Sequence, residues 1–143
     1  MKSHITIILD EDTKEILSGL KKALAPHWLD PDSIESMKNH HWDYWYFPDG
    51  FPVEKNELRI DFPNEDAEVL ANTCYINTLP DNYTTSGIID TNGNWNDLQD
   101  HGWKLVNGSG LANQRAMKKW KIKMKQILNE NKDKICVQVV LHC

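Results

Sequence analysis

The stretch HITIILDEDTKEILSGLKKALAP (residues 4–26) decides the fold class, because a strand pattern passes directly into a helix pattern. Residues 4–9 alternate and are rich in β-branched side chains, which predicts a strand. Asp12 can then cap the first turn of a helix, with Glu15 in the capping-box position three residues later. The helix is predicted from apolar residues at helical spacing, namely Ile16, Leu17, Leu20 and Leu24. Pro26 ends it, so the chain opens with a strand followed by a helix.

The next part of the sequence predicts a loop, two strands and a short helix. Residues 26–41 hold two prolines and many polar groups, which is typical of a loop. The aromatic run WDYWYF at residues 42–47 predicts a strand with aromatic side chains on both faces. A second strand is expected at residues 57–62, where apolar and charged residues alternate, and a short helix at residues 66–72.

The C-terminal half predicts a hairpin, a long helix and a final strand. Asn-Gly at residues 92–93 tolerates the positive φ of a tight turn, which favours a hairpin between residues 86–90 and a strand from Trp95. Residues 111–129 place apolar side chains on one helical face and basic side chains around the rest. The strand at residues 135–142 is partly apolar on both faces, as a central strand needs.

Together these elements predict an α+β fold. We expect two helices on one face of a mostly antiparallel sheet, with a ferredoxin-like core and an inserted hairpin. A length of 143 residues suits one hydrophobic core. No repeat, low-complexity tract or linker divides the chain, so residues 1–143 are expected to form a single domain.

The composition indicates a reducing compartment and no membrane association. No apolar run approaches the roughly 20 residues that span a bilayer. The run at residues 5–9 is too short for an export signal, and acidic residues follow it. The cysteines (Cys74, Cys136 and Cys143) form no C-x-x-C pair. We therefore expect a cytoplasmic protein.

Charge is segregated along the chain. The net charge of −5 combines −11 in residues 1–110 with +6 in residues 111–143. The basic face of the long helix is formed by Arg115, Lys118, Lys121 and Lys125. This face is either an ordinary solvated surface or a contact for an anionic partner, such as an acidic protein. Stable binding to duplex nucleic acid is not expected, because the rest of the chain is strongly acidic.

The aromatic run is the first candidate site. Its residues Trp42, Tyr44, Trp45 and Tyr46 could form the wall of a ligand or partner site, with Trp45 and Tyr46 the best candidates. Aromatic rings stack on nucleobases and also anchor protein interfaces. Alternatively, one face of the run is core and the other packs under a loop, and both interpretations can hold in part.

A second candidate is Gly108-Ser109-Gly110, which precedes the long helix. A helix N-terminus presents free N–H groups and a partial positive charge, so this segment could seat a phosphate. It lacks the Lys-Ser/Thr of a Walker loop and the spacing of a dinucleotide fingerprint. A flexible loop with Ser109 as the helix cap explains the same residues.

Other chemistry receives little support from the sequence. His40, His41 and Asp43 offer possible metal ligands, which His101 and His142 could join. Adjacent histidines point in opposite directions in an extended segment, so no metal is expected. There is no G-x-S-x-G motif, no reactive-cysteine context and no Ser–His–Asp signature. We therefore assign no catalytic residues and favour a binding protein over an enzyme.

Five short elements carry a family resemblance: LAP at residues 24–26, WDYW at 42–45, DTNGNW at 90–95, HGW at 101–103, and the His and Cys at residues 142–143 that end the last strand. In this order they resemble elements of a family of short, uncharacterised bacterial and phage proteins, whose aromatic element reads Trp-Asp-Trp-Trp. Where that family continues with Gly-Gly-Arg-Trp, this chain has FPDG at residues 47–50. The resemblance implies a phage or mobile-element origin.

The functional expectation is a non-enzymatic binding module without a cofactor. We expect an accessory protein of a phage or mobile element that binds a protein partner, such as an anti-defence factor that blocks a host protein. The alternative is a nucleotide- or phosphoester-handling protein that uses the aromatic strand and the Gly-Ser-Gly helix start. An oligomeric structural component is a third interpretation.

Overall fold

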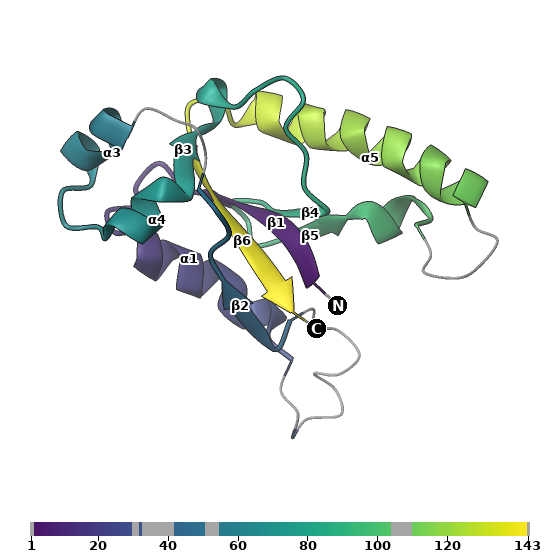
Figure 1. The fold of residues 1–143 in the computed structure, drawn as a ribbon, viewed down its shortest axis with the longest axis horizontal. Helices are drawn as coiled ribbons and strands as arrows, with labels where there is room; N and C mark the ends of the chain where they lie inside the picture. The colour runs from purple at the N-terminus through teal and green to yellow at the C-terminus, as the bar shows by residue number, and fades with distance from the viewer. Residues whose placement is uncertain (1, 30–31, 33–41, 51–54, 104–109, 143) are drawn as a thin grey trace.

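The computed structural model describes residues 2–29, 32, 42–50, 55–103 and 110–142. They form a mixed α+β fold in which helices flank a six-stranded sheet (Figure 1), as the sequence predicted. The strands are β1 (Lys2–Leu9), β2 (Tyr44–Tyr46), β3 (Thr73–Tyr75), β4 (Gly87–Ile89), β5 (Trp95–Asp97) and β6 (Ile135–His142). The helices are α1 (Ile16–Leu24), α3 (Lys55–Asp61), α4 (Ala67–Ala71) and α5 (Gly110–Glu130), with short 3-10 helices η1 (Ala25–His27), η2 (Ile76–Thr78) and η3 (Leu98–His101). None of the helices in these ranges is long and apolar enough to cross a membrane.

The sheet is mostly antiparallel, which confirms that part of the prediction. Its strand order is β2-β6-β1-β4-β5, and β3 also pairs with β6. Strand β6 runs antiparallel to β1 along its whole length, from the pair Lys2–His142 to the pair Leu9–Ile135. Among the strand pairs of the described residues, β1–β4 alone is parallel. The two longest strands therefore lie inside the sheet, with shorter strands at its edges.

The two long helices cover opposite faces of the sheet (Figure 1). Helix α1 and β1 share a hydrophobic cluster that includes Ile5, Ile7, Leu9, Ile16, Leu20 and Leu24. Helix α5 belongs to a second cluster that includes Ile8, Ile88, Cys136, Trp120, Met124 and Ile127. Because successive strand residues point to opposite faces, Ile7 and Ile8 mark the two sides.

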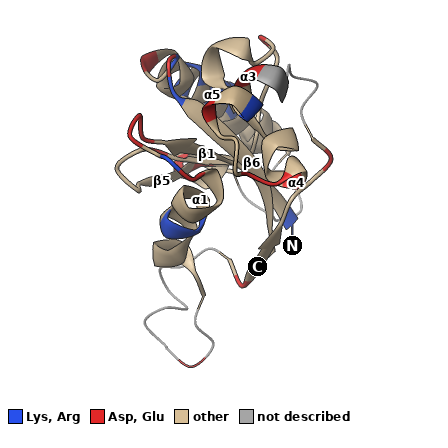
Figure 2. Cartoon of the chain, turned by 90° about the vertical axis from the view of Figure 1, so that its left-hand side faces the viewer, with Lys and Arg blue, Asp and Glu red and all other residues tan. Residues whose placement is uncertain are grey.

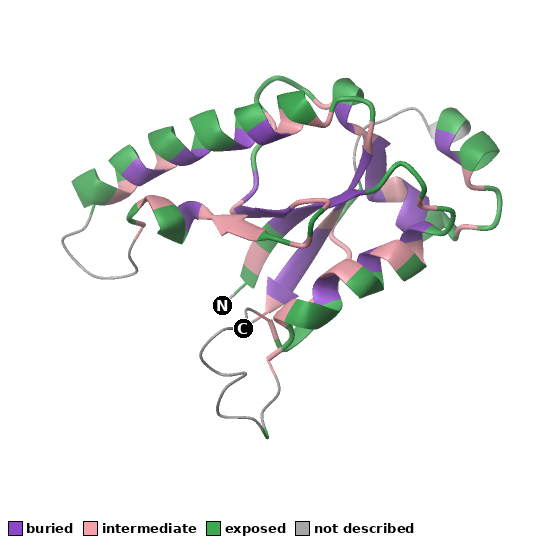
Figure 3. Ribbon diagram, turned by 180° about the vertical axis from the view of Figure 1, so that it is seen from behind, coloured by how far each residue is buried: buried purple, intermediate pink, exposed green. Residues whose placement is uncertain are grey.

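The expectation that both helices cover one face is therefore wrong. The physical reason is that the central strands are apolar on both sides. On β6, Val137 and Val139 belong to the α1 cluster, whereas Cys136 belongs to the α5 cluster. Both apolar faces of the sheet must be shielded from water, and one helix packs on each face. Figure 3 shows these strands as the buried layer between the helices.

The ferredoxin-like core is not confirmed. Such a core is built around a split β-α-β unit, in which another strand separates the two parallel strands. Here the parallel strands β1 and β4 are direct neighbours, paired from Ile5–Gly87 to Ile7–Ile89. The predicted hairpin is confirmed, since β4 and β5 pair antiparallel. In its turn Gly93 has a φ of +81°, a conformation that a residue with a side chain rarely adopts.

Residues 57–62 do not form the predicted strand. Helix α3 occupies all of them except Phe62, which follows it, with Leu58 buried at 1% exposure and Ile60 exposed at 78%. The alternation that suggested a strand also places Leu58 and Phe62 four residues apart, on one side of a helix. Helix α4 confirms the predicted short helix, whereas β3 had no recognisable pattern in the sequence.

Helix α1 begins later than predicted and is capped differently. Its first residue is Ile16, and Glu15, at the N-cap position, makes no side-chain capping bond. Asp12 is therefore not the cap. Instead, Oε1 of Glu65 accepts hydrogen bonds from the backbone N–H groups of Ile16 and Leu17, the latter at 3.3 Å. A carboxylate at this end also complements the helix dipole.

Candidate functional site

The aromatic run of β2 divides between the two faces of the sheet. Trp42, Trp45 and Phe47 are partly buried and pack against the α1 cluster. The indole Nε1 of Trp42 donates a hydrogen bond to the carbonyl oxygen of Leu24 at 2.8 Å. Trp45 and Phe47 contact each other edge to face, with ring centroids 5.2 Å apart. These side chains attach β2 to the core, so for Trp42 and Trp45 the core interpretation holds.

The two tyrosines of β2 lie on the opposite face and are open to solvent. Tyr44 is 48% exposed and Tyr46 is 38% exposed. Tyr44 is paired with His142 of β6, and the two rings are stacked with centroids 4.5 Å apart and planes 12° apart. The ammonium group of Lys2 lies 5.6 Å from the centroid of the Tyr46 ring, within cation–π range. Of the four residues predicted to form the wall of a site, Tyr44 and Tyr46 are therefore exposed to solvent.

A hydrogen bond to Asp43 fixes the position of His142 beside Tyr44. Its Nδ1 lies 2.8 Å from Oδ1 of Asp43, which also accepts the backbone N–H of Tyr44 at 2.8 Å. The hydrogen bond from His142, aided by the N–H of Tyr44, holds the pKa of Asp43 below its usual value. The tyrosine, the histidine and the aspartate thus support one another.

Trp28 extends this exposed group. It is 42% exposed, and its indole Nε1 donates a hydrogen bond to the carbonyl oxygen of Asp43 at 3.3 Å. We refer to the set Lys2, Trp28, Asp43, Tyr44, Tyr46 and His142 as the tyrosine surface. The sequence pattern does not select Lys2 or Trp28, and it offers His142 only as a possible metal ligand. No local signal joins these residues, because strand pairing brings them together.

The tyrosine surface lies at an end of the sheet that α5 does not cover. Along β1, Lys2 and His4 are exposed, whereas the five residues from Ile5 to Leu9 are buried. Helix α5 packs on this same sheet face farther along, at Ile8 and Cys136. Strand β2 is also an edge strand. Both termini of the described chain lie beside this end of the sheet (Figure 1).

The predicted basic face is exposed along α5. Arg115, Lys118, Lys121 and Lys125 are all exposed, opposite the buried Ala116, Trp120, Met124 and Ile127. Figure 2 shows basic residues on this helix. Lys121 and Lys125 also line a groove, whereas Arg115 and Lys118 do not.

The remaining predicted residues lie largely outside the described part of the chain. Of the predicted phosphate seat, Gly108 and Ser109 fall outside it, and Gly110 is the exposed first residue of α5. His40 and His41 also fall outside it. Within the described ranges, no group of three or more His, Cys, Asp or Glu side chains is placed to hold a metal ion.

The tyrosine surface is the candidate site because it combines exposed aromatic rings with a fixed supporting layer. Its residues come from β1, β2, β6, the segment after η1 and the residue before β2. The resemblance to short bacterial and phage proteins stays an expectation, since no family model, no curated protein and no solved structure matches this chain.

Proposed function

We propose that this chain is a non-enzymatic binding module that anchors a protein partner on the tyrosine surface. The observation that carries the proposal is the exposure of Tyr44 and Tyr46 from a strand whose opposite side chains are packed in the core. Tyrosine and tryptophan are enriched among the residues that dominate protein interfaces. A rigid backbone beneath two such rings suits an anchor.

The support beneath Tyr44 lowers the cost of binding. A side chain that is already held in place loses less conformational freedom when a partner covers it. Tyr44 is stacked on His142, and His142 is held by Asp43. Among the described residues, no strand pairs with the outer edge of β2, and its backbone groups can pair with an extended segment of the partner.

The proposed partner is a host protein that a phage or mobile-element accessory factor blocks. The family resemblance of the WDYW and DTNGNW elements supports this part of the proposal. Such a role needs a stable complex and no catalytic residue, which agrees with the absence of a recognisable catalytic motif in the sequence.

The second candidate function is a base-stacking site for a nucleotide or for single-stranded nucleic acid. The same exposed rings favour it, together with the ammonium group of Lys2 beside Tyr46. The two candidates differ in their ligand, so direct binding to purified ligands separates them.

The test compares wild type with the double variant Y44A/Y46A. Proteins captured from a bacterial host lysate are identified, purified and titrated against both forms by calorimetry. Interface tyrosines often contribute about 2 kcal/mol each, so the double variant should bind at least about thirtyfold more weakly. The variant I60A is the matched control, because Ile60 is an exposed apolar side chain on α3, away from β2.

Equal binding by wild type and Y44A/Y46A would overturn the proposal. If single-stranded oligonucleotides bind wild type and not the double variant, while no protein does, the base-stacking candidate replaces it. Near-ultraviolet circular dichroism of each variant checks that the fold is kept.

A further inference from the structure

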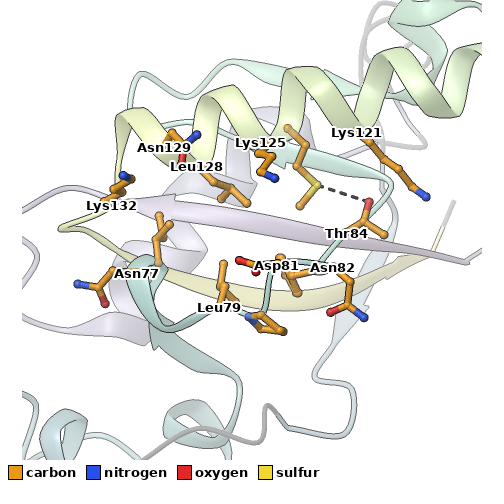
Figure 4. Close-up of a pocket in the computed structure, with 14 residues that line it drawn as sticks. Asn77, Leu79, Asp81, Asn82, Thr84, Lys121, Lys125, Leu128, Asn129 and Lys132 are labelled. Atoms are coloured by element: carbon orange, nitrogen blue, oxygen red, sulfur yellow. Dashed lines mark hydrogen bonds between the residues drawn. The ribbon is translucent and has the colours of Figure 1, made fainter.

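A groove of about 590 Å³ lies between residues 76–84 and the C-terminal half of α5. Figure 4 shows α5 as one wall, with Lys121, Lys125 and Asn129, and the 76–84 segment as the other, with Asn77, Asp81 and Asn82. The groove contains neither Tyr44 nor Tyr46, so it is separate from the tyrosine surface.

Both ends of the groove are fixed by hydrogen bonds. At one end, the backbone N–H groups of Ile76 and Asn77 donate to the carbonyl oxygens of Lys134 and Lys132 at 2.9 and 3.1 Å. At the other end, the backbone N–H of Thr85 donates to Sδ of Met124 at 3.4 Å. The indole of Trp120 donates to the carbonyl oxygen of Thr85 at 2.6 Å. These hydrogen bonds therefore hold the two walls of the groove at a fixed distance from each other.

The lining of the groove carries a positive charge in an acidic protein. Lys121, Lys125 and Lys132 line it, against the single acidic residue Asp81. The chain as a whole has a net charge of −5. Within the described residues, none of these lysines forms a salt bridge with a carboxylate. Three ammonium groups along one concave surface favour an anion.

The rest of the lining is suited to an organic group. Met124 is buried at 1% exposure and forms the floor together with the partly buried Leu79 and Leu128. The side-chain amides of Asn77, Asn82 and Asn129 line the same space and can both donate and accept hydrogen bonds. An inorganic anion can use the lysines and the amide N–H groups, whereas a larger organic molecule also covers the apolar floor.

We infer that this groove binds an organic phosphate of nucleotide size. The phosphate groups contact Lys121 and Lys125, and the organic part lies on Leu79, Met124 and Leu128, toward the end of the groove where Lys132 lies. The volume falls within the range of about 300–1,000 Å³ that small-molecule sites occupy. Asp81 stands on the wall opposite the lysines, where its carboxylate accepts a hydrogen bond from a hydroxyl or amino group of the ligand.

The experiment titrates the full chain with ATP, pyrophosphate and adenosine by calorimetry. We expect saturable binding of ATP, weaker binding of pyrophosphate and the weakest binding of adenosine. The double variant K121Q/K125Q should raise the dissociation constant for ATP about tenfold or more, because hydrogen bonds to charged groups are strong. The matched control is K119Q/K123Q, which removes the same charge from exposed positions of α5 outside the groove and should change it less than about twofold.

Nuclear magnetic resonance locates the ligand independently. Addition of ATP should shift the side-chain amide signals of Asn77, Asn82 and Asn129. The inference is wrong if ATP does not bind, if both double variants weaken binding equally, or if these signals do not move. Loss of ATP binding in Y44A/Y46A with unchanged binding in K121Q/K125Q would place the nucleotide on the tyrosine surface instead. Because the two sites share no residue, either proposal can fail without the other.

Discussion

Cys74 and Cys136 face each other directly across β3 and β6, with their Sγ atoms 3.8 Å apart. Both side chains are buried in the α5 cluster. Their mutual hydrogen bond lowers the pKa of Cys74 and, together with full burial, raises the pKa of Cys136. Directly opposed residues of an antiparallel pair have Cα atoms about 4.5–5.5 Å apart, which is compatible with a disulfide.

Oxidation should therefore link the two strands. With diamide as the oxidant, both thiols lose their hydrogens to the diamide, which becomes a hydrazine, and an S–S bond forms between Cys74 and Cys136. A thiol titration in denaturant should fall from three free thiols to one. The variant C143S should lose both of its thiols in the same way. Intermolecular dimers that persist in C143S would contradict this expectation.

Removal of the Glu65 carboxylate should destabilise the protein through α1. Glu65 accepts the N–H groups of Ile16 and Leu17, which otherwise have no partner within the helix. The variant E65A should lose about 1 kcal/mol of unfolding free energy, as other lost helix caps do. Urea unfolding followed by circular dichroism measures the loss. The control E11A removes the same charge from an exposed position and should leave the unfolding midpoint nearly unchanged.

Trp120 should be sensitive even to a conservative change. It is fully buried, and its indole N–H donates to the carbonyl oxygen of Thr85. The variant W120F keeps most of the apolar volume but leaves that carbonyl without its donor, which should cost about 1–3 kcal/mol. The variant W28F serves as comparison, since Trp28 is exposed and its bond to Asp43 is longer. Equal urea midpoints for W120F and wild type would show that another group satisfies the carbonyl.

The parts of the fold that the sequence predicts are those with a local pattern. Strand β1, helices α1 and α5 and strand β6 follow directly from apolar spacing. Residues 57–62 show how a short pattern misleads, because Leu58 and Phe62 fit one side of a helix as well as one face of a strand. The sheet topology depends on pairings between distant segments, and spacing alone does not encode them.

The sequence predicts less of the candidate sites than of the fold, because their residues come from distant segments. The exposed tyrosines belong to a run that sequence reasoning selected, but it could not tell which face was buried. The contact between Tyr44 and His142 joins β2 to the last strand, and the cap from Glu65 reaches back to the first helix. The groove depends on residues 76–84, whose pattern is weak.

The hydrogen bond between His142 and Asp43 should make the tyrosine surface sensitive to acid. Asp43 has a pKa below its ordinary value of 3.8 in the folded protein, so its ionised form is stabilised by folding. This stabilisation is present above the unfolded pKa and is lost as the pH falls through the lower, folded value. The variant D43N should therefore be less stable than wild type near neutral pH.

This difference between D43N and wild type should shrink in acid. Urea unfolding of both proteins at about pH 7 and at about pH 3 measures it, because at the lower pH Asp43 of the unfolded chain is largely protonated and the advantage of the folded, ionised form is reduced. The control D49N changes an exposed aspartate just beyond β2 and should show no such convergence. A difference between D43N and wild type that stays constant with pH would mean that the contribution of Asp43 does not depend on its charge. In that case the geometry around Tyr44 would be held by neutral hydrogen bonds and by the ring stacking with His142.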